Sequence, residues 1–340
     1  MDQSLVTPYT QQYNAGIQWG FTKDTVLEID GTYTGGRALT GVTDINTYNG
    51  RVACSSATAR AACVAAQAAG EIPRTRFSSR RINTGFAGDN FRSNNFGSNY
   101  YGLLVSVTKR ISHGLQFNSN YTWSHAIDTL SDAFNNARGA ILRPTDNFNI
   151  PLDKGNADFD IRHRFVTSAF YELPILRKNR WLGGWSMSGI LTLQKGVPVQ
   201  IFTGSSSGDT NRDGYNTDRP LITGIPYLSG KSPADGWLNP ASFSSFGCPT
   251  TVNFGLWCDS PTGRNTLRAP GFVNTDFGVA KKFKITERWR LQFQANFFNI
   301  FNHPNFGVPN GNLASASTFG LSTFDFNGPR ITQLALRFDF

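Results

Sequence analysis

Gln333-Leu334-Ala335-Leu336-Arg337-Phe338-Asp339-Phe340 alternates strictly between polar or small side chains and large apolar ones. Leu334, Leu336, Phe338 and Phe340 therefore fall on one face of the strand that this pattern predicts, and the other residues fall on the opposite face. A strand that ends the sequence on an aromatic residue is typical of an outer-membrane barrel. In such a barrel the last strand pairs with the first, because an open edge is not tolerated in lipid.

The composition favours a transmembrane barrel over a soluble domain. Charged residues make up 16% of the 340 residues, whereas soluble proteins average about 25%. Aromatic residues make up 13%, with 28 phenylalanines. A barrel whose strands face lipid on one side and water on the other has this composition. No apolar run reaches the ~18 residues that a transmembrane helix needs. The first residues also lack the apolar core of an export signal, so we expect the chain to be a fragment of an exported protein.

Alternating segments of about ten residues, the length that crosses a bilayer at barrel tilt, recur along the chain. We expect strands near residues 12–19, 27–33, 101–108, 115–123, 164–173, 185–194, 272–282, 289–297 and 333–340. Short links follow the first, third, fifth and seventh strands (20–24, 109–114, 174–184 and 283–287). Long links follow the others (roughly 35–98, 128–160, 204–270 and 302–329). A soluble sandwich shares the alternation, but short turns on one side and long loops on the other indicate an outer-membrane barrel.

The sequence thus predicts an all-β fold: an antiparallel transmembrane β-barrel, partial, with about nine to twelve strands and long extracellular loops. Nine spans would start outside the cell and end inside it. A complete single-chain barrel has an even number of strands with both ends inside. We therefore expect that strands N-terminal to this chain complete a larger barrel.

The net charge of +9 does not point to nucleic acid, since the basic residues are spread over turns and one loop rather than one helix or patch. We expect no nucleic-acid partner. The arginine-rich loop over 74–92 predicts attraction of anionic solutes or of lipopolysaccharide phosphates. Outer-membrane lipid is the expected surrounding of the apolar face.

Two cysteine pairs, Cys54 with Cys63 and Cys248 with Cys258, lie in polar loops and suggest local disulfides in an oxidising compartment. The stretch 56–69 is rich in alanine and favours a helix. Cysteines nine residues apart on one helix would lie about 13.5 Å apart, too far to bridge. Either that helix starts after Cys54 or the first disulfide is absent.

One loop resembles half of a calcium site. Asp209, Asn211 and Asp213 occupy the first, third and fifth positions of a calcium loop, and Gly214 follows them. The twelfth position is Pro220, which offers no side-chain ligand, so Asp218 would have to substitute. A turn-rich outer loop without calcium explains the same residues. No other cofactor is indicated.

No catalytic set is apparent, and we expect no enzymatic activity. The four histidines are far apart in sequence and are expected to make hydrogen bonds in turns and at strand ends. Asp158, Asp160, Arg162 and Arg164 form a mixed-charge cluster at the entry to a strand. These four side chains either line the lumen or pair with one another.

Several segments resemble the barrel region of Oar-like TonB-dependent receptors, in an order that spans nearly the whole chain. These segments are Thr7-Pro8-Tyr9, Gln12-Tyr13-Asn14, Gly16-Ile17-Gln18, 121–128, 160–165, Asp218-Arg219-Pro220, Trp237-Leu238-Asn239-Pro240, Gly263-Arg264-Asn265, 297–306 and the terminal strand. The resemblance implies a 22-stranded barrel with a plug inside and an N-terminal regulatory-like domain. Residues 1–340 would then be a C-terminal fragment of the barrel domain, without the plug or that domain.

The same resemblance implies a function in the bacterial outer membrane: TonB-dependent uptake of an unidentified nutrient. The TonB complex would act only through the missing N-terminal parts. Leu334, Leu336, Phe338 and Phe340 resemble the signal that the barrel assembly machinery reads. Two alternatives remain open. The first is a passive porin or structural barrel without energy coupling, and the second is an outer-membrane enzyme.

Overall fold

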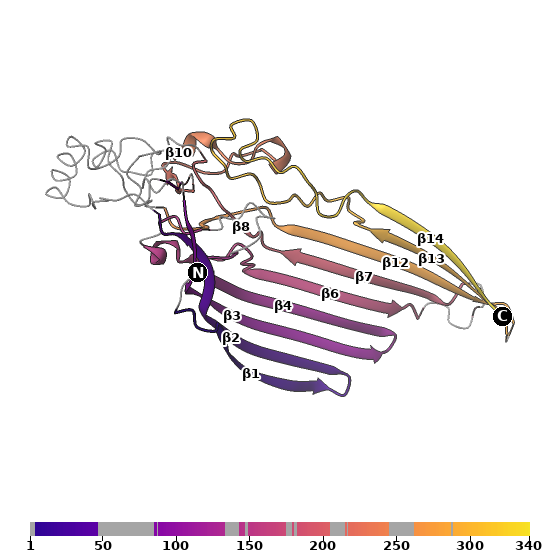
Figure 1. The fold of residues 1–340 in the computed structure, drawn as a ribbon. Helices are drawn as coiled ribbons and strands as arrows, with labels where there is room; N and C mark the ends of the chain where they lie inside the picture. The colour runs from indigo at the N-terminus through magenta and orange to yellow at the C-terminus, as the bar shows by residue number, and fades with distance from the viewer. Residues whose placement is uncertain are drawn as a thin grey trace.

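The computed structural model describes residues 4–46, 85–86, 88–132, 143–146, 149–174, 179, 182–204, 215, 217–244, 262–286 and 288–340. Ten strands form one antiparallel sheet, nine of them in a single path and β5 pairing with β4 beside it (Figure 1). The path contains β1 (Tyr9–Thr22), β2 (Thr25–Asp44), β3 (Asn90–Ser112), β4 (Leu115–Asp128), β6 (His163–Glu172), β7 (Trp185–Gln194), β12 (Phe272–Lys284), β13 (Arg290–Phe298) and β14 (Ile331–Asp339). β5 covers Gly155–Asn156. The prediction of nine spans and of an antiparallel all-β fold is confirmed.

Connections alternate in length along this path, as the sequence predicts. Two residues join β1 to β2 and two join β3 to β4, whereas 34 positions separate β4 from β6 (129–162). Figure 1 shows the C-terminus at the same end of the sheet as the short turns. Short turns face the periplasm in outer-membrane barrels and long loops face outward. We call these two ends of the sheet the periplasmic end and the outer end.

Two strands are longer than predicted. β2 has 20 residues and β3 has 23, so the link between them covers 45–89 rather than 35–98. Glycine and asparagine in these extensions indicate turns, but here the strands continue through register shifts between Gly36, Leu39 and Gly41. Such bulges add residues without ending the pairing. The β2–β3 hairpin therefore extends beyond what is needed to cross a hydrocarbon core of ~30 Å.

Cross-strand register separates the two faces of the sheet. One continuous row of partners is apolar or aromatic throughout: Ile17, Ile29, Val105, Tyr121, Phe165, Leu193 and Val273. The next row, on the opposite face, is mostly polar: Gln18, Glu28, Ser106, Asn120, Val166, Thr192 and Asn274. The first face suits lipid and the second suits a water-filled interior. We call them the lipid face and the lumen face.

Aromatic rings gather at two levels of the lipid face. The Tyr33 ring lies between those of Tyr13 and Tyr101, stacked on the first at 6.1 Å and tilted against the second at 5.2 Å, centroid to centroid. At the periplasmic end the ring of Trp289 lies 5.0 Å from that of Phe338. Aromatic residues prefer both membrane–water interfaces. Tyr33 and Tyr101 lie inside their strands because β2 and β3 continue outward past this level.

The buried apolar core lies in the outer loops rather than in the sheet. It consists of Val199, Ile201, Leu238, Phe243, Leu267, Ala269 and Phe319. Short elements frame it: β8 (Pro198–Val199) pairs with β11 (Leu267–Arg268), and β9 (Leu221–Ile222) pairs with β10 (Phe243–Ser244). The 3-10 helices in the described residues are η1 (Ile150–Asp153), η3 (Pro233–Asp235) and η4 (Pro240–Ser242). The loops between β7 and β12 and after β13 thus pack as one body, which we call the loop body.

None of the described helices has both the length and the apolarity that crossing a lipid bilayer requires.

The sheet does not close on itself. Within the described residues β1 pairs only with β2, and β14 pairs only with β13. The other edge of β1 and the other edge of β14 are therefore unpaired among these residues. A barrel is closed by pairing such edges. The observed arrangement is an open arc of barrel wall.

Candidate functional site

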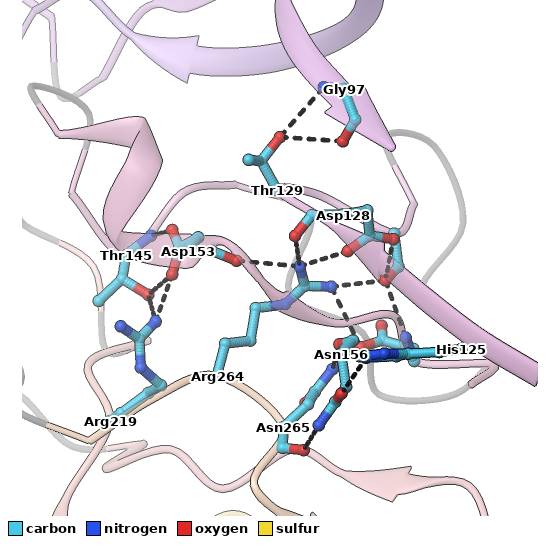
Figure 2. A network of polar contacts seen from close by, with 12 residues as sticks. Gly97, His125, Asp128, Thr129, Thr145, Asp153, Asn156, Arg219, Arg264 and Asn265 are labelled. Atoms are coloured by element: carbon cyan, nitrogen blue, oxygen red, sulfur yellow. Dashed lines mark hydrogen bonds and ion pairs between the residues drawn. The ribbon is translucent and has the colours of Figure 1, made fainter. Parts of the chain in front are cut away.

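Arg264 lies at the centre of a polar network at the outer end of the sheet (Figure 2). Its side chain comes from the loop between β7 and β12 and is only 6% exposed. One guanidinium nitrogen lies 2.5 Å from an Asp128 carboxylate oxygen, at the end of β4. The other lies 2.5 Å from the Ser131 hydroxyl and 3.4 Å from the Asp158 carboxylate. Arg264 thereby joins the end of β4, the loop that follows it and the loop body.

Arg219 makes a second connection between the same loops. It is 4% exposed and forms an ion pair with Asp153 of η1. Its guanidinium also donates to the Thr145 hydroxyl at 2.7 Å and to the Thr262 carbonyl at 2.6 Å. The Asp153 carboxylate accepts from the Thr145 backbone N–H as well. Because each buried charge has partners, the network avoids the cost of an isolated buried ion.

Asp160 forms a third connection, between β4 and the strand β11. Its carboxylate accepts the Ala126 backbone N–H at 2.6 Å and the Arg162 guanidinium at 2.8 Å, and it pairs with Arg268. Burial raises the pKa of Asp160, but the hydrogen bonds from Ala126, Arg162 and Arg268 outweigh it and hold the pKa below its usual range. The carboxylate is therefore charged at neutral pH.

Two asparagines hold the loops together through their backbones. The Asn156 side chain donates to the Asn265 carbonyl at 2.9 Å, and the Asn265 side chain donates to the Asn156 carbonyl at 2.7 Å. Asn265 adopts a positive φ of 57°, a conformation that asparagine tolerates better than most residues. His125 lies 3.1 Å from the Asn156 amide oxygen. This reciprocal pair fixes the loop body against β5.

The network reaches the outer end of β2. The Tyr215 hydroxyl donates to the Asp44 carboxylate at 3.0 Å, across 171 positions of sequence. The Arg143 guanidinium lies 4.3 Å from the centre of the Tyr215 ring, within the range of a cation–π contact. The outer end of β2 and described parts of the long connections after β4 and after β7 are thus held together.

The predicted mixed-charge cluster pairs mainly with residues far away in sequence. Asp160 pairs with Arg162, which agrees with the expectation that members of the cluster pair with one another. However, Asp158 also pairs with Arg264, and Asp160 also pairs with Arg268. Arg164 lies on the lumen face of β6, opposite Thr122 and Gln194. Both expectations, pairing and lining the lumen, are met by different members of the cluster.

The predicted calcium residues fall mostly outside the described residues: Asp209, Asn211 and Asp213 do, whereas Asp218 lies inside them. Asp218 is 1% exposed, and its backbone carbonyl accepts a hydrogen bond from the Thr203 backbone N–H at 2.9 Å. In the described part of the chain no three His, Cys, Asp or Glu side chains gather as metal ligands. All four cysteines, Cys54, Cys63, Cys248 and Cys258, also lie outside the described residues.

Three of the predicted assembly-signal residues lie on the lipid face of β14, and Phe340 directly follows the strand. Leu334, Leu336, Phe338 and Phe340 are 66%, 69%, 44% and 90% exposed. The Trp289 ring lies 6.4 Å from the Phe340 ring, centroid to centroid. These side chains are accessible along the open edge of the sheet, and their role in assembly stays a prediction.

Sequence reasoning singled out Arg219, Arg264 and Asn265 only as parts of family-like motifs, and it missed Asp128 and Asp153 as their partners. Arg219 and Asp153 are 66 positions apart, and Arg264 and Asp128 are 136 apart. No local pattern links such residues. The charged residues at the ends of β4 and before β6 are a signal that could have suggested buried ion pairs.

An open arc of antiparallel strands with a lipid face, a lumen face and long outer loops defines the class: the wall of a bacterial outer-membrane β-barrel. The profile of the family described as "Outer membrane beta barrel domain" matches residues 1–333, and the chain belongs to this family. The location in the bacterial outer membrane follows from this membership.

Among solved structures, the chain is similar to the outer-membrane transporter YddB from Escherichia coli. The two are 11% identical with a TM-score of 0.50, over 100% of this chain and 33% of that one. BauA, the ferric preacinetobactin receptor from Acinetobacter baumannii, is 10% identical with a TM-score of 0.46, over 97% and 29%. Identities this low show the fold alone, and this chain spans about a third of the length of YddB. None of the curated proteins compared with the chain matches it significantly.

Proposed function

We propose that this chain supplies part of the wall and outer loops of a TonB-dependent receptor of the Oar-like type, which takes up a scarce nutrient. The observation that carries the proposal is the nine-strand path of alternating short turns and long loops, whose fold is similar to that of a transporter over the whole chain. The nutrient is not specified by these features.

We propose further that residues 1–340 are a C-terminal part of a barrel of about 22 strands. The open edges of β1 and β14 support this, because unpaired backbone groups within lipid each cost several kcal/mol. Additional strands N-terminal to β1 would pair with both edges. Contact with the TonB complex would come from parts of the protein beyond these residues.

The buried network supports a receptor whose outer face is pre-organised. Arg219, Arg264 and Arg268 tie the loop body to η1, to the end of β4 and to Asp160 just before β6. A binding surface that is already ordered loses less conformational entropy when a ligand arrives. The loops would therefore present a fixed surface to the nutrient, with lipopolysaccharide around the barrel.

Leu334, Leu336, Phe338 and Phe340 would guide assembly as the terminal strand that the barrel assembly machinery reads. Their exposed, alternating arrangement on an edge strand supports this role. Replacing Phe340 with serine should lower the amount of protein in the outer membrane. Replacing Ile111, an exposed apolar residue near the short turn between β3 and β4, with serine should not.

Calcium binding by the 209–218 segment remains a proposal that rests on residue spacing. Calorimetric titration of the full chain with calcium should give heat of binding that Asp213→Ala removes. Without such heat in the unaltered chain, the segment is an ordinary polar loop.

Energy dependence distinguishes a receptor from a passive porin. Cells that carry the complete protein should accumulate its nutrient only while a proton gradient exists, and the purified protein should give no steady conductance in planar bilayers. Steady conductance together with uptake that survives a protonophore would instead favour the porin.

A further inference from the structure

Basic side chains form a strip on the lumen face near the periplasmic end of the sheet. Lys282 and Lys284 lie on β12, Arg290 lies on β13, and all three are exposed. Lys284 is directly opposite Arg290 in the strand register. Gln292, the partner of Lys282, is itself opposite Arg337 on β14. Three neighbouring strands thus present positive charge to the interior at one level.

The strip has more positive than negative charge. Among the acidic residues nearby, Asp339 lies opposite Arg290 but binds Arg337 at 2.7 Å. Asp276 lies farther along β12, opposite Ile190, and its carboxylate accepts the Asn274 side-chain amide at 3.0 Å and the Asn299 backbone N–H at 2.9 Å. Glu172 lies on β6, opposite Ser186 and separated from β12 by β7. Like charges directly opposite each other on paired strands are destabilising. An anion beside Lys284 and Arg290 would relieve this repulsion.

A hollow of about 150 Å³ lies beside the strip on the same face. Gly278, Ala280 and Lys282 are among the residues that line it. Its other polar lining consists of Ser186, Ser188, Gln292, Gln294 and Asn296. A Cβ atom at position 278 would lie 2.7 Å from the Ser188 hydroxyl oxygen, so the hollow depends on glycine there. Hydroxyl, amide and ammonium donors together suit a carboxylate or phosphate group.

A larger hollow of about 460 Å³ adjoins the first and shares Phe170, Ser188, Gly278 and Asn296 with it. Phe170 and Ile190 belong to its lining, and both lie on the lumen face in register with Ser188 and Ser168. Asp276 also lines this hollow, opposite Ile190 and six positions from Lys282 along β12, so the negative head group of a bound anion is expected at the Lys282 side. Ile190 is 47% exposed, although this face is otherwise mostly polar. An apolar surface next to polar donors is typical of small-molecule sites.

We propose that these two hollows form a binding site for a small organic anion. Its carboxylate or phosphate group would lie by Lys282 and the Ser186–Ser188 hydroxyls, and its apolar body would lie on Phe170 and Ile190. The basic strip would attract such anions along the wall toward the periplasm. The inference rests on the proposed function in one respect, that this face lines a transport path, and it deepens that function by naming the class of solute.

Equilibrium dialysis of the full chain, folded in a zwitterionic detergent, tests the site with three probes of similar shape. Phenylacetate and phenyl phosphate carry different head groups, a carboxylate and a phosphate, that are both negative, and phenethylammonium carries a positive charge. We expect binding of at least one anion and weaker binding of the cation. Which anion binds more tightly distinguishes a carboxylate from a phosphate site.

Two variants separate charge from shape. Lys282→Gln/Lys284→Gln/Arg290→Gln should weaken anion binding about tenfold, which is about 1.4 kcal/mol. The matched control Lys23→Gln/Lys154→Gln/Lys231→Gln removes the same charge elsewhere and should leave binding unchanged. Gly278→Leu should abolish binding by filling the hollow while every charge stays in place.

Equal effects of the two triple variants, full binding by Gly278→Leu, or equal binding of phenethylammonium would overturn the proposal. Heat-modifiable migration in gels reports separately whether the chain folds as a barrel wall. A chain that folds in this way but binds neither anion contradicts only the inference about the solute. A chain that never acquires that migration contradicts the proposed function itself.

Discussion

Arg264 and Asp128 form a buried ion pair across 136 positions of sequence, with a nitrogen–oxygen distance of 2.5 Å. Arg264 is 6% exposed and Asp128 is 4% exposed. The pair joins the loop body to the last residue of β4, and so couples the outer loops to the barrel wall. Removing one partner of such a pair is strongly destabilising, because the other charge then stays buried without compensation.

Replacing Arg264 with leucine should open the outer loops locally. The Asp128 carboxylate would stay buried without its cation, at a cost of about 3–5 kcal/mol. Amide hydrogens of residues 126–132 should then exchange more than roughly 100-fold faster, since about 1.4 kcal/mol is tenfold. Arg337→Leu is the control, because its pair with Asp339 is exposed and worth less than about 1 kcal/mol. Equal exchange in both variants would show that the network does not hold the loops.

Acid should loosen the same loops through Asp160. Its folded pKa lies below the value of about 3.9 in an unfolded chain. The carboxylate therefore stabilises the folded loops fully above pH ~4, and this stabilisation is lost as pH falls through the folded pKa. Exchange of the Ala126 amide should rise below pH ~4. In Asp160→Asn that rise should be absent, since no carboxylate remains to protonate.

Ser119 and Thr167 should be energetically coupled on the lipid face. Their hydroxyl oxygens lie 2.6 Å apart across β4 and β6, so each satisfies the other where water is absent. Ser119→Ala and Thr167→Val should each destabilise the protein, and the double variant should cost less than their sum by about 1 kcal/mol. Urea titration of the chain folded into lipid vesicles measures this. Strict additivity would place these hydroxyls in contact with water.

Gly41→Val should disrupt the outer part of the β2–β3 hairpin alone. A Cβ at position 41 would lie 2.1 Å from the Phe96 ring, which is 3% exposed and has no room to move aside. Residues beyond Gly36 should lose amide protection while the membrane part of both strands keeps it. Gly20→Val is the control, since the nearest atom to its Cβ would be 3.9 Å away. Loss of the whole sheet in Gly41→Val would mean that the extension is not a separable unit.

The strands were predictable because their signal is local. Alternation over about ten residues fixes which side chains face lipid, and the turn residues between strands fix the short links. The extensions of β2 and β3 were missed because Gly35, Gly36 and Gly41 suppress the alternation there. In the structure those glycines accompany bulges and a close approach to Phe96.

The candidate site was predictable only in part. The histidines do make hydrogen bonds at turns and strand ends, as His163 does with Tyr121 at 2.8 Å. The partners of Arg219 and Arg264 come from loops that approach only when the whole wall is formed. Such pairing depends on tertiary contacts, and a single sequence contains no periodic signal for it.

The central claim is that these strands form a membrane-spanning wall with lipid on one face and water on the other. The alternation between lipid and water along β6 tests this claim most directly. Register places Thr167 and Ala169 on the lipid face and Val166 and Ser168 on the lumen face, although their polarities alone would not sort them this way. Spin labels attached one at a time to cysteines at 166–169, in protein folded into vesicles, report access to oxygen and to a water-soluble nickel chelate. We predict that oxygen dominates at 167 and 169 and that nickel dominates at 166 and 168. Equal access at all four positions, in a chain that stays monomeric in water without detergent, would contradict a membrane-spanning wall.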